Sequence, residues 1–84
     1  MRLPVIKGLV DFIETHDEDY LNESAEVLEH LSQVKGIKQD ELIVIGELLS
    51  NIFGALEVTQ EIRRGKEKNK ALNAFMQRVV GTVS

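Results

Sequence analysis

The two histidines are the side chains of this sequence best suited to hold a metal ion or to transfer a proton. His16 and His30 flank a segment predicted to be helical, which separates them by about 20 Å along the helix axis. Zinc holds its ligands at about 2 Å, so one chain cannot close a two-histidine site, although a dimer could. Glu26 lies four residues before His30 and lacks the Glu-x-x-His spacing of di-iron bundles. We therefore expect exposed polar residues here and no metal site.

Nucleophilic chemistry also finds no support in the sequence. Ser24 and Ser32 lie near His30 only along the chain, and neither a Gly-x-Ser-x-Gly elbow nor a glycine-rich phosphate loop is present. The chain has no cysteine, which excludes disulfides, thiolate metal sites and thiol catalysis. We predict a protein that is not an enzyme and that carries no cofactor.

A basic stretch, RRGKEKNK (63–70), is the clearest charge feature. Its basic residues could contact phosphates; they are Arg63, Arg64, Lys66, Lys68 and Lys70. However, no aromatic residue is interleaved for base recognition, and residues 1–60 hold 12 acidic against 4 basic residues. Two other interpretations are that Arg63 and Arg64 complement the C-terminal end of a helix, and that the stretch faces an acidic helix. Nucleic-acid binding therefore stays an alternative and is not the favoured function.

Four helical segments and no strand are predicted from the spacing of apolar residues and from helix start and stop signals. The predicted ranges are Pro4–Thr15, Glu18–Val34, Asp40–Arg64 and Glu67–Val80. Asp17 or Asp19 is expected to cap the second helix and Asp40 the third. Gly36 and Gly65 suit the left-handed positions that follow helix ends.

The third segment is the most apolar. Its residues Leu42, Ile45, Leu49, Ile52, Leu56 and Thr59 follow alternating steps of three and four, which is typical of a packed helix pair. Further apolar residues lie outside this row, so the helix must be covered on nearly every side. The other segments, of about 12–17 residues, are too short to cover a rod of about 37 Å. We therefore expect a homodimer, with Leu49, Ile52, Phe53 and Leu56 as interface candidates; the alternative is a compact monomer.

Small residues recur along the same helix at Gly46, Ser50 and Gly54. An interior glycine destabilises a helix by about 1 kcal/mol relative to alanine. A ridge without side-chain bulk lets another helix approach closely, and the packing gained there offsets this cost. The same pattern occurs in membrane helices, but Glu47 and Glu57 interrupt an apolar run shorter than the roughly 20 residues that a span requires. We expect no membrane segment.

Length and composition complete the expected fold. A chain of 84 residues forms a single domain (1–84) with a thin core, and self-association is the usual support left to a chain without cysteine. The expected architecture is all-α: a small bundle of four helices built on one long central helix, dimeric. The N-terminus lacks the long apolar core of a signal peptide, so we expect a cytoplasmic protein.

Three stretches, LPVIKGLVDFIETHDEDY, ELIVIGELLSNIFGALEV and ALNAFMQRV, resemble a short, uncharacterised bacterial family labelled as a domain of unknown function. The resemblance spans nearly the whole chain, and it implies no activity and no site residues. From the residues themselves we expect a non-enzymatic interaction or accessory protein that acts through helix packing and an acidic surface. The alternatives are nucleic-acid binding through residues 63–70, and a dimer that binds a ligand or metal near His16 or His30.

Overall fold

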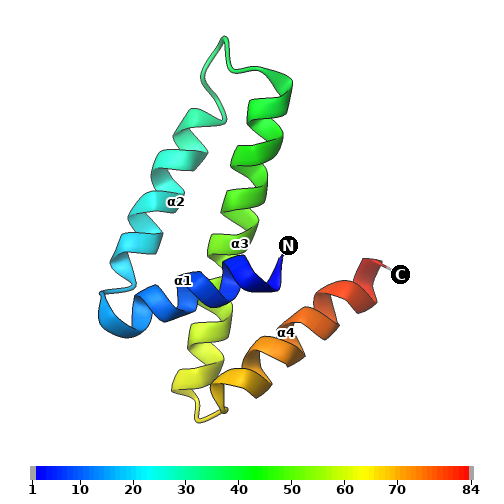
Figure 1. The fold of residues 1–84 in the computed structure, drawn as a ribbon. Helices are drawn as coiled ribbons and strands as arrows, with labels where there is room; N and C mark the ends of the chain where they lie inside the picture. The colour runs from blue at the N-terminus through cyan, green and yellow to red at the C-terminus, as the bar shows by residue number, and fades with distance from the viewer. Residues whose placement is uncertain (1, 84) are drawn as a thin grey trace.

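The computed structural model describes the backbone of residues 2–83 and the side chains of residues 2–79. Its four helices are α1 (Leu3–Thr15), α2 (Asp19–Leu31), α3 (Gln39–Arg63) and α4 (Lys68–Val83) (Figure 1). No strand occurs in the part of the chain that the model describes. The predicted all-α fold of four helices is therefore confirmed.

The predicted end of α2 is wrong by three residues. Beyond Leu31 the backbone N–H groups of Gln33 and Val34 bond to carbonyls three residues back, which is the pattern of turns and not of an α-helix. Gly36 then takes a positive φ of 94° and redirects the chain toward α3. Gly65, with φ 103°, has the same role after α3, as predicted.

The predicted cap of α3 is also wrong. The helix begins at Gln39, and Lys38, with extended backbone angles, occupies the position that Asp40 was expected to hold. The Glu41 carboxylate accepts the N–H of Lys38 at 2.9 Å, which satisfies a backbone donor before the first turn. Asp40 lies inside that turn, where its charge still complements the helix dipole. Before α2 the N-cap position is Glu18, which makes no side-chain cap hydrogen bond, so neither Asp17 nor Asp19 holds the predicted position. Asp17 does accept the N–H of Asp19 at 2.9 Å.

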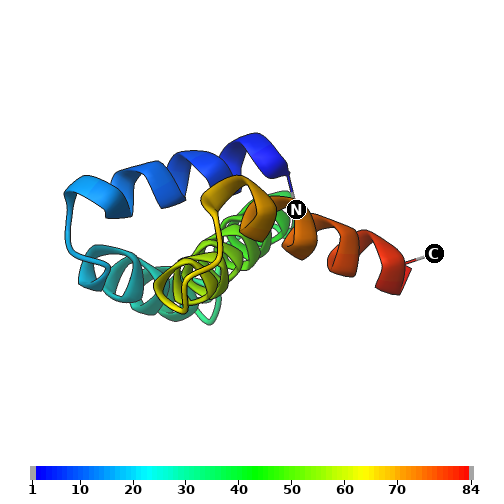
Figure 2. The same cartoon turned by 90° about the horizontal axis from the view of Figure 1, so that it is seen from below.

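The long helix α3 organises the fold, because α1, α2 and α4 all pack onto it. Helices α2 and α3 form an antiparallel pair, and α1 crosses in front of this pair at its lower half (Figures 1 and 2). Helix α4 starts beside the end of α3 and diverges from it (Figure 1). The resulting body measures 43 × 34 × 17 Å, so it is a thin slab.

The core lies against the C-terminal half of α3. Its best buried members are Ile6 and Val10 of α1 and Ala55 and Val58 of α3, with Phe75 of α4 beside them. Every buried residue of α3 falls between positions 51 and 59. The N-terminal half of the helix therefore contributes no fully buried side chain to the core.

The chain is more extended than its length requires. A compact domain of 84 residues has a radius of gyration of about 12 Å, whereas the value here is 13.7 Å. The accessible surface is 5835 Å², and the scaling for a monomer of this mass gives about 5,000 Å². The helices thus leave more surface in contact with water than a monomer of this size usually does.

Candidate interaction surface on α3

Apolar side chains of the N-terminal half of α3 are open to water. Ile43 and Val44 are each 54% exposed, and Leu48 is 44% exposed. Only α2 packs alongside this half of α3, because α1 and α4 lie against the other half (Figure 1); we call it the uncovered half in this sense. Large apolar side chains clustered in this way are typical of interaction surfaces.

Two shallow depressions adjoin at Val44. One is lined by Val44 and Leu48 of α3 together with Val5 and Arg2 at the start of α1. The other is lined by apolar residues of α2, the connection and α3, with two acids at its edge; they are Leu31, Ile37, Val44, Ile45, Asp40 and Glu41. Because Glu47 and Asn51 also line the first depression, this side of α3 is concave and combines apolar with polar side chains.

The row of small residues is divided between two environments. A methyl group built on Gly54 would lie 3.0 Å from Phe75 of α4 and 3.4 Å from Ile6 of α1, so this glycine allows a close approach of helices. Gly46 has nothing within 4 Å, and Ser50 is exposed. Gly46 and Gly54 are eight residues apart, so they differ by about 80° around the helix and by about 12 Å along it. Gly54 therefore faces α4 while Gly46 faces water.

The predicted interface candidates are also divided. Ile52 is 6% exposed and belongs to the core of its own chain, and Leu49 and Leu56 pack partly against that core. Phe53 is 48% exposed and is free to meet a second molecule. The row with steps of three and four thus packs within the chain, and only Phe53 of the four candidates stays open to a partner.

Most of the basic stretch is paired with acids of the same chain. Arg63 bonds to Glu18 at 2.7 Å, just before α2, and Arg64 bonds to Glu61 at 2.8 Å. Lys66 lies 3.9 Å from Glu61. Because these cations are compensated locally, the stretch presents less net positive charge than its sequence indicates.

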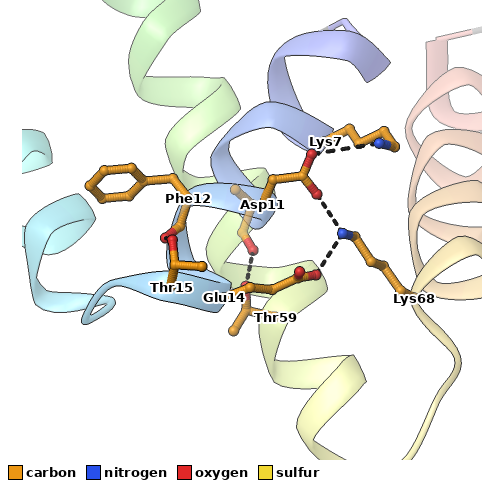
Figure 3. Close-up of polar contacts among 8 residues, drawn as sticks. Lys7, Asp11, Phe12, Glu14, Thr15, Thr59 and Lys68 are labelled. Atoms are coloured by element: carbon orange, nitrogen blue, oxygen red, sulfur yellow. Dashed lines mark hydrogen bonds and ion pairs between the residues drawn. The ribbon is translucent and has the colours of Figure 1, made fainter.

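Lys68 and Lys70 differ in whether they form ion pairs with acids of the same chain. Lys68, at the start of α4, bonds to Asp11 and lies 2.5 Å from Glu14, both on α1 (Figure 3). Lys7 adds a weaker contact to Asp11 at 3.5 Å. Lys70 has no ion pair with any residue that the structure describes. The acidic side chains of α1 therefore hold the first turn of α4 in place.

These contacts shift two pKa values. The hydrogen bond from Lys68 lowers the pKa of Asp11 below its usual 3.8, outweighing the opposing effect of burial. The hydrogen bonds to Asp11 and then to Glu14 raise the pKa of Lys68 above 10.5. Both shifts favour the charged forms, as expected of an ion pair that joins two helices.

An aromatic cluster at the corner between α1 and α2 was not predicted. The ring of His16 stacks on Phe12 with centroids 4.0 Å apart, and Tyr20 meets both rings edge-on. Nδ1 of His16 also lies 3.0 Å from the carbonyl oxygen of Phe12. The spacing of four between Phe12 and His16 was the available signal, since such residues are neighbours on a helix.

The histidines lie at opposite ends of α2 in the fold, with His30 exposed in its last turn. Among the described residues no three His, Asp or Glu side chains gather in a way that could hold a metal ion. His16 instead takes part in the ring stack with Phe12.

Helix α3 is long and apolar enough to cross a membrane by length and composition alone. One third of its most apolar window is buried inside the chain. A single helix of this kind is weak evidence, because the central helix of a soluble protein passes the same test. The prediction that the chain has no membrane segment therefore stays a prediction.

Fold and surface together define a small all-helical protein whose most distinctive feature is an uncovered apolar half of its central helix. The chain belongs to the family of unknown function DUF6952, whose model matches residues 1–84. The resemblance to an uncharacterised helical family is thus confirmed. No curated protein and no solved structure matches the chain.

Proposed function

We propose that this chain is a non-enzymatic interaction or accessory protein that acts through helix packing, and that it forms a homodimer through α3. The observation that carries the proposal is the exposure of large apolar side chains on two faces of α3. Ile43 and Phe53 lie on the face where a second copy can pack, and Val44 and Leu48 lie on the opposite face, where another partner can pack. Burial of apolar surface yields about 25 cal/mol per Å². A partner that covers these side chains therefore gains a large driving force.

The excess surface supports the same proposal. The accessible area of 5835 Å² exceeds the monomer expectation by about 800 Å². Each partner of a stable complex of standard size buries about 800 Å². The surface in excess is thus about as large as one side of a specific interface.

Charge selects among partners. Helix α2 exposes the acidic residues Glu23, Glu26 and Glu29, and the whole chain has a formal net charge of −4. Such a surface attracts basic protein segments and repels nucleic acid. Nucleic-acid binding through Arg63, Arg64, Lys66, Lys68 and Lys70 is less favoured because four of these five cations lie within 4 Å of acidic groups. No observation on the described residues favours the ligand- or metal-binding dimer.

The proposal is tested by sedimentation equilibrium over a wide range of concentrations. We expect a reversible change from monomer to dimer, whose midpoint gives the dissociation constant. A chain that stays monomeric at the highest concentration would remove the homodimer from the proposal. Capture of partners from the native cell, with a Leu48→Glu variant as the control bait, tests the wider interaction role: partners retained equally by both baits would exclude this surface.

A further inference from the structure

One face of α3 is exposed along most of the length of the helix, although Glu57 at its C-terminal end pairs with Arg78 of α4. Positions that follow one another by steps of four, three, four, three and four share a face of an α-helix. Starting from the first residue of α3, these positions are Gln39, Ile43, Gly46, Ser50, Phe53 and Glu57, and all six are exposed. We call this set the outer stripe. Its ends lie 18 steps apart along the helix, or about 27 Å by helical rise.

The outer stripe has the same sequence of residue types in both directions. From either end it gives a polar residue, a large apolar residue and a small residue, and its midpoint falls at Leu48. If two such helices lie antiparallel with a two-fold axis between Gly46 and Ser50, Ile43 of one faces Phe53 of the other. In the same register Gly46 faces Ser50, and Gln39 faces Glu57.

We propose that the homodimer forms by antiparallel packing of α3 on α3 of a second copy through this outer stripe, with the two-fold axis between Gly46 and Ser50. The inference rests on the self-association proposed above and deepens it by naming the surface and the register. A two-fold interface must be self-complementary, because the same patch is presented by both copies. The outer stripe meets this requirement in one orientation.

Packing favours that orientation. At the centre, Gly46 against Ser50 places no bulky side chain between the helices, so their axes can approach to the lower end of the usual 8–10 Å. At each end, Ile43 and Phe53, 54% and 48% exposed in the single chain, cover one another. Two equivalent apolar contacts therefore flank a close central approach.

The absence of cysteine from the sequence allows a direct test by disulfide formation. We expect an oxidised mixture of the single variants Ile43→Cys and Phe53→Cys to give the mixed disulfide dimer, identified by its mass. Either variant alone should give little, because identical positions lie about 15 Å apart along the paired axes. A disulfide requires Cα atoms within about 7 Å. Efficient cross-linking of Ile43→Cys alone would overturn the antiparallel register.

Val44 provides the matched control. It is next to Ile43 and has the same exposure of 54%, but it lies about 100° around the helix and outside the outer stripe. A mixture of Val44→Cys and Phe53→Cys should therefore form little mixed disulfide on oxidation. A cross-linking yield equal to that of the Ile43 and Phe53 pair would overturn the assignment of this face.

A noncovalent measurement separates this inference from the proposed function. We expect Ile43→Glu to weaken dimerisation at least about tenfold, since it buries a carboxylate among apolar groups, while Val44→Glu changes it little. Both variants should keep their helical circular dichroism, because both positions are exposed. A chain that dimerises equally well with Ile43→Glu keeps the proposed function and loses this interface. A wild-type chain without any dimer loses both.

Discussion

The two halves of α3 are both rich in apolar residues, but their surroundings differ. In the C-terminal half, Ala55 and Val58 are buried beneath α1 and α4. In the N-terminal half, Ile43, Val44 and Leu48 are about half exposed, although they are at least as apolar. The comparison shows that apolar content alone does not determine burial within a chain of this size.

Helix length explains the difference. Helix α3 has 25 residues, whereas α1 and α2 have 13 each and α4 has 16. Helix α1 crosses α3 and does not run along it, so it covers one segment only (Figure 1). Helix α4 starts at the end of α3 and diverges, which leaves the N-terminal half to α2 alone. The covered half stabilises the monomer, and the uncovered half is available to partners.

The largest expected effect compares a core residue with a surface residue. Ile6 is 0% exposed, and Ile6→Ala should lower the free energy of unfolding by about 2–5 kcal/mol. Val44→Ala, in the uncovered half, should change the stability of the monomer by less than about 0.5 kcal/mol. Urea unfolding of dilute protein measures both. The total free energy of unfolding of a chain of this length is only about 4–12 kcal/mol. Ile6→Ala should therefore remove a large part of it.

Equal effects of these two substitutions would contradict the division of α3 into a covered and an uncovered half. The same result would mean that the N-terminal half is packed in solution. A concentration series separates packing within the chain from packing in a dimer, because only the second depends on protein concentration.

The next effect compares the same substitution at two glycines. Gly54→Leu must displace Phe75 and Ile6, whose atoms already lie within 3.4 Å of an added methyl group. Such overpacking costs about 1–3 kcal/mol. A Cβ added at Gly46 meets nothing within 4 Å, and Gly46→Leu should stabilise the monomer by up to about 1 kcal/mol through its higher helix propensity. Thermal unfolding at low concentration should therefore shift in opposite directions.

The homodimer gives the second glycine another readout. In the proposed register, a leucine at Gly46 separates the two α3 helices at their centre. Gly46→Leu should thus raise the stability of the monomer and weaken the dimer. A variant that strengthens both would contradict the close approach at this position.

The four helices could be predicted from the sequence because their signals are local. Apolar spacing and the turn glycines Gly36 and Gly65 define them within three residues. Errors at the ends arose where two local signals competed: Asp40 is a good cap by residue type, but the Glu41 carboxylate satisfies the N–H of Lys38 one turn earlier. Boundaries of this kind depend on single hydrogen bonds.

Which half of α3 is covered could not be predicted, because it depends on contacts between distant residues. Arg63 bonds to Glu18, 45 residues away, and Lys68 bonds to Asp11, 57 residues away. The sequence does show that Arg63 and Lys68 are basic, which favoured a phosphate-binding interpretation as one alternative. Pairing across the fold gives these cations a structural role that no local pattern reveals.

The smallest expected effect concerns the ion pairs that fasten α4 to the covered half. The lowered pKa of Asp11 contributes stability above its ordinary 3.8, and this contribution is lost as the pH falls through the folded-state pKa. The raised pKa of Lys68 contributes below 10.5 and is lost as the pH rises through its folded-state value. The stability difference between wild type and Lys68→Met should therefore be constant between these limits and shrink on both sides.

Lys70→Met is the matched control, since Lys70 is on the same turn of α4 without an ion pair among the described residues. Its stability difference from wild type should stay near zero at every pH, because exposed single charges contribute little. The Lys68 effect is itself small for the same reason, as Lys68 and its acids are partly open to water. Urea unfolding across the pH range measures both variants. Identical pH profiles for the two lysines would show that the Lys68 ion pairs do not hold α4, which would leave Phe75 with its apolar neighbours and the Arg78–Glu57 ion pair to hold it against α3.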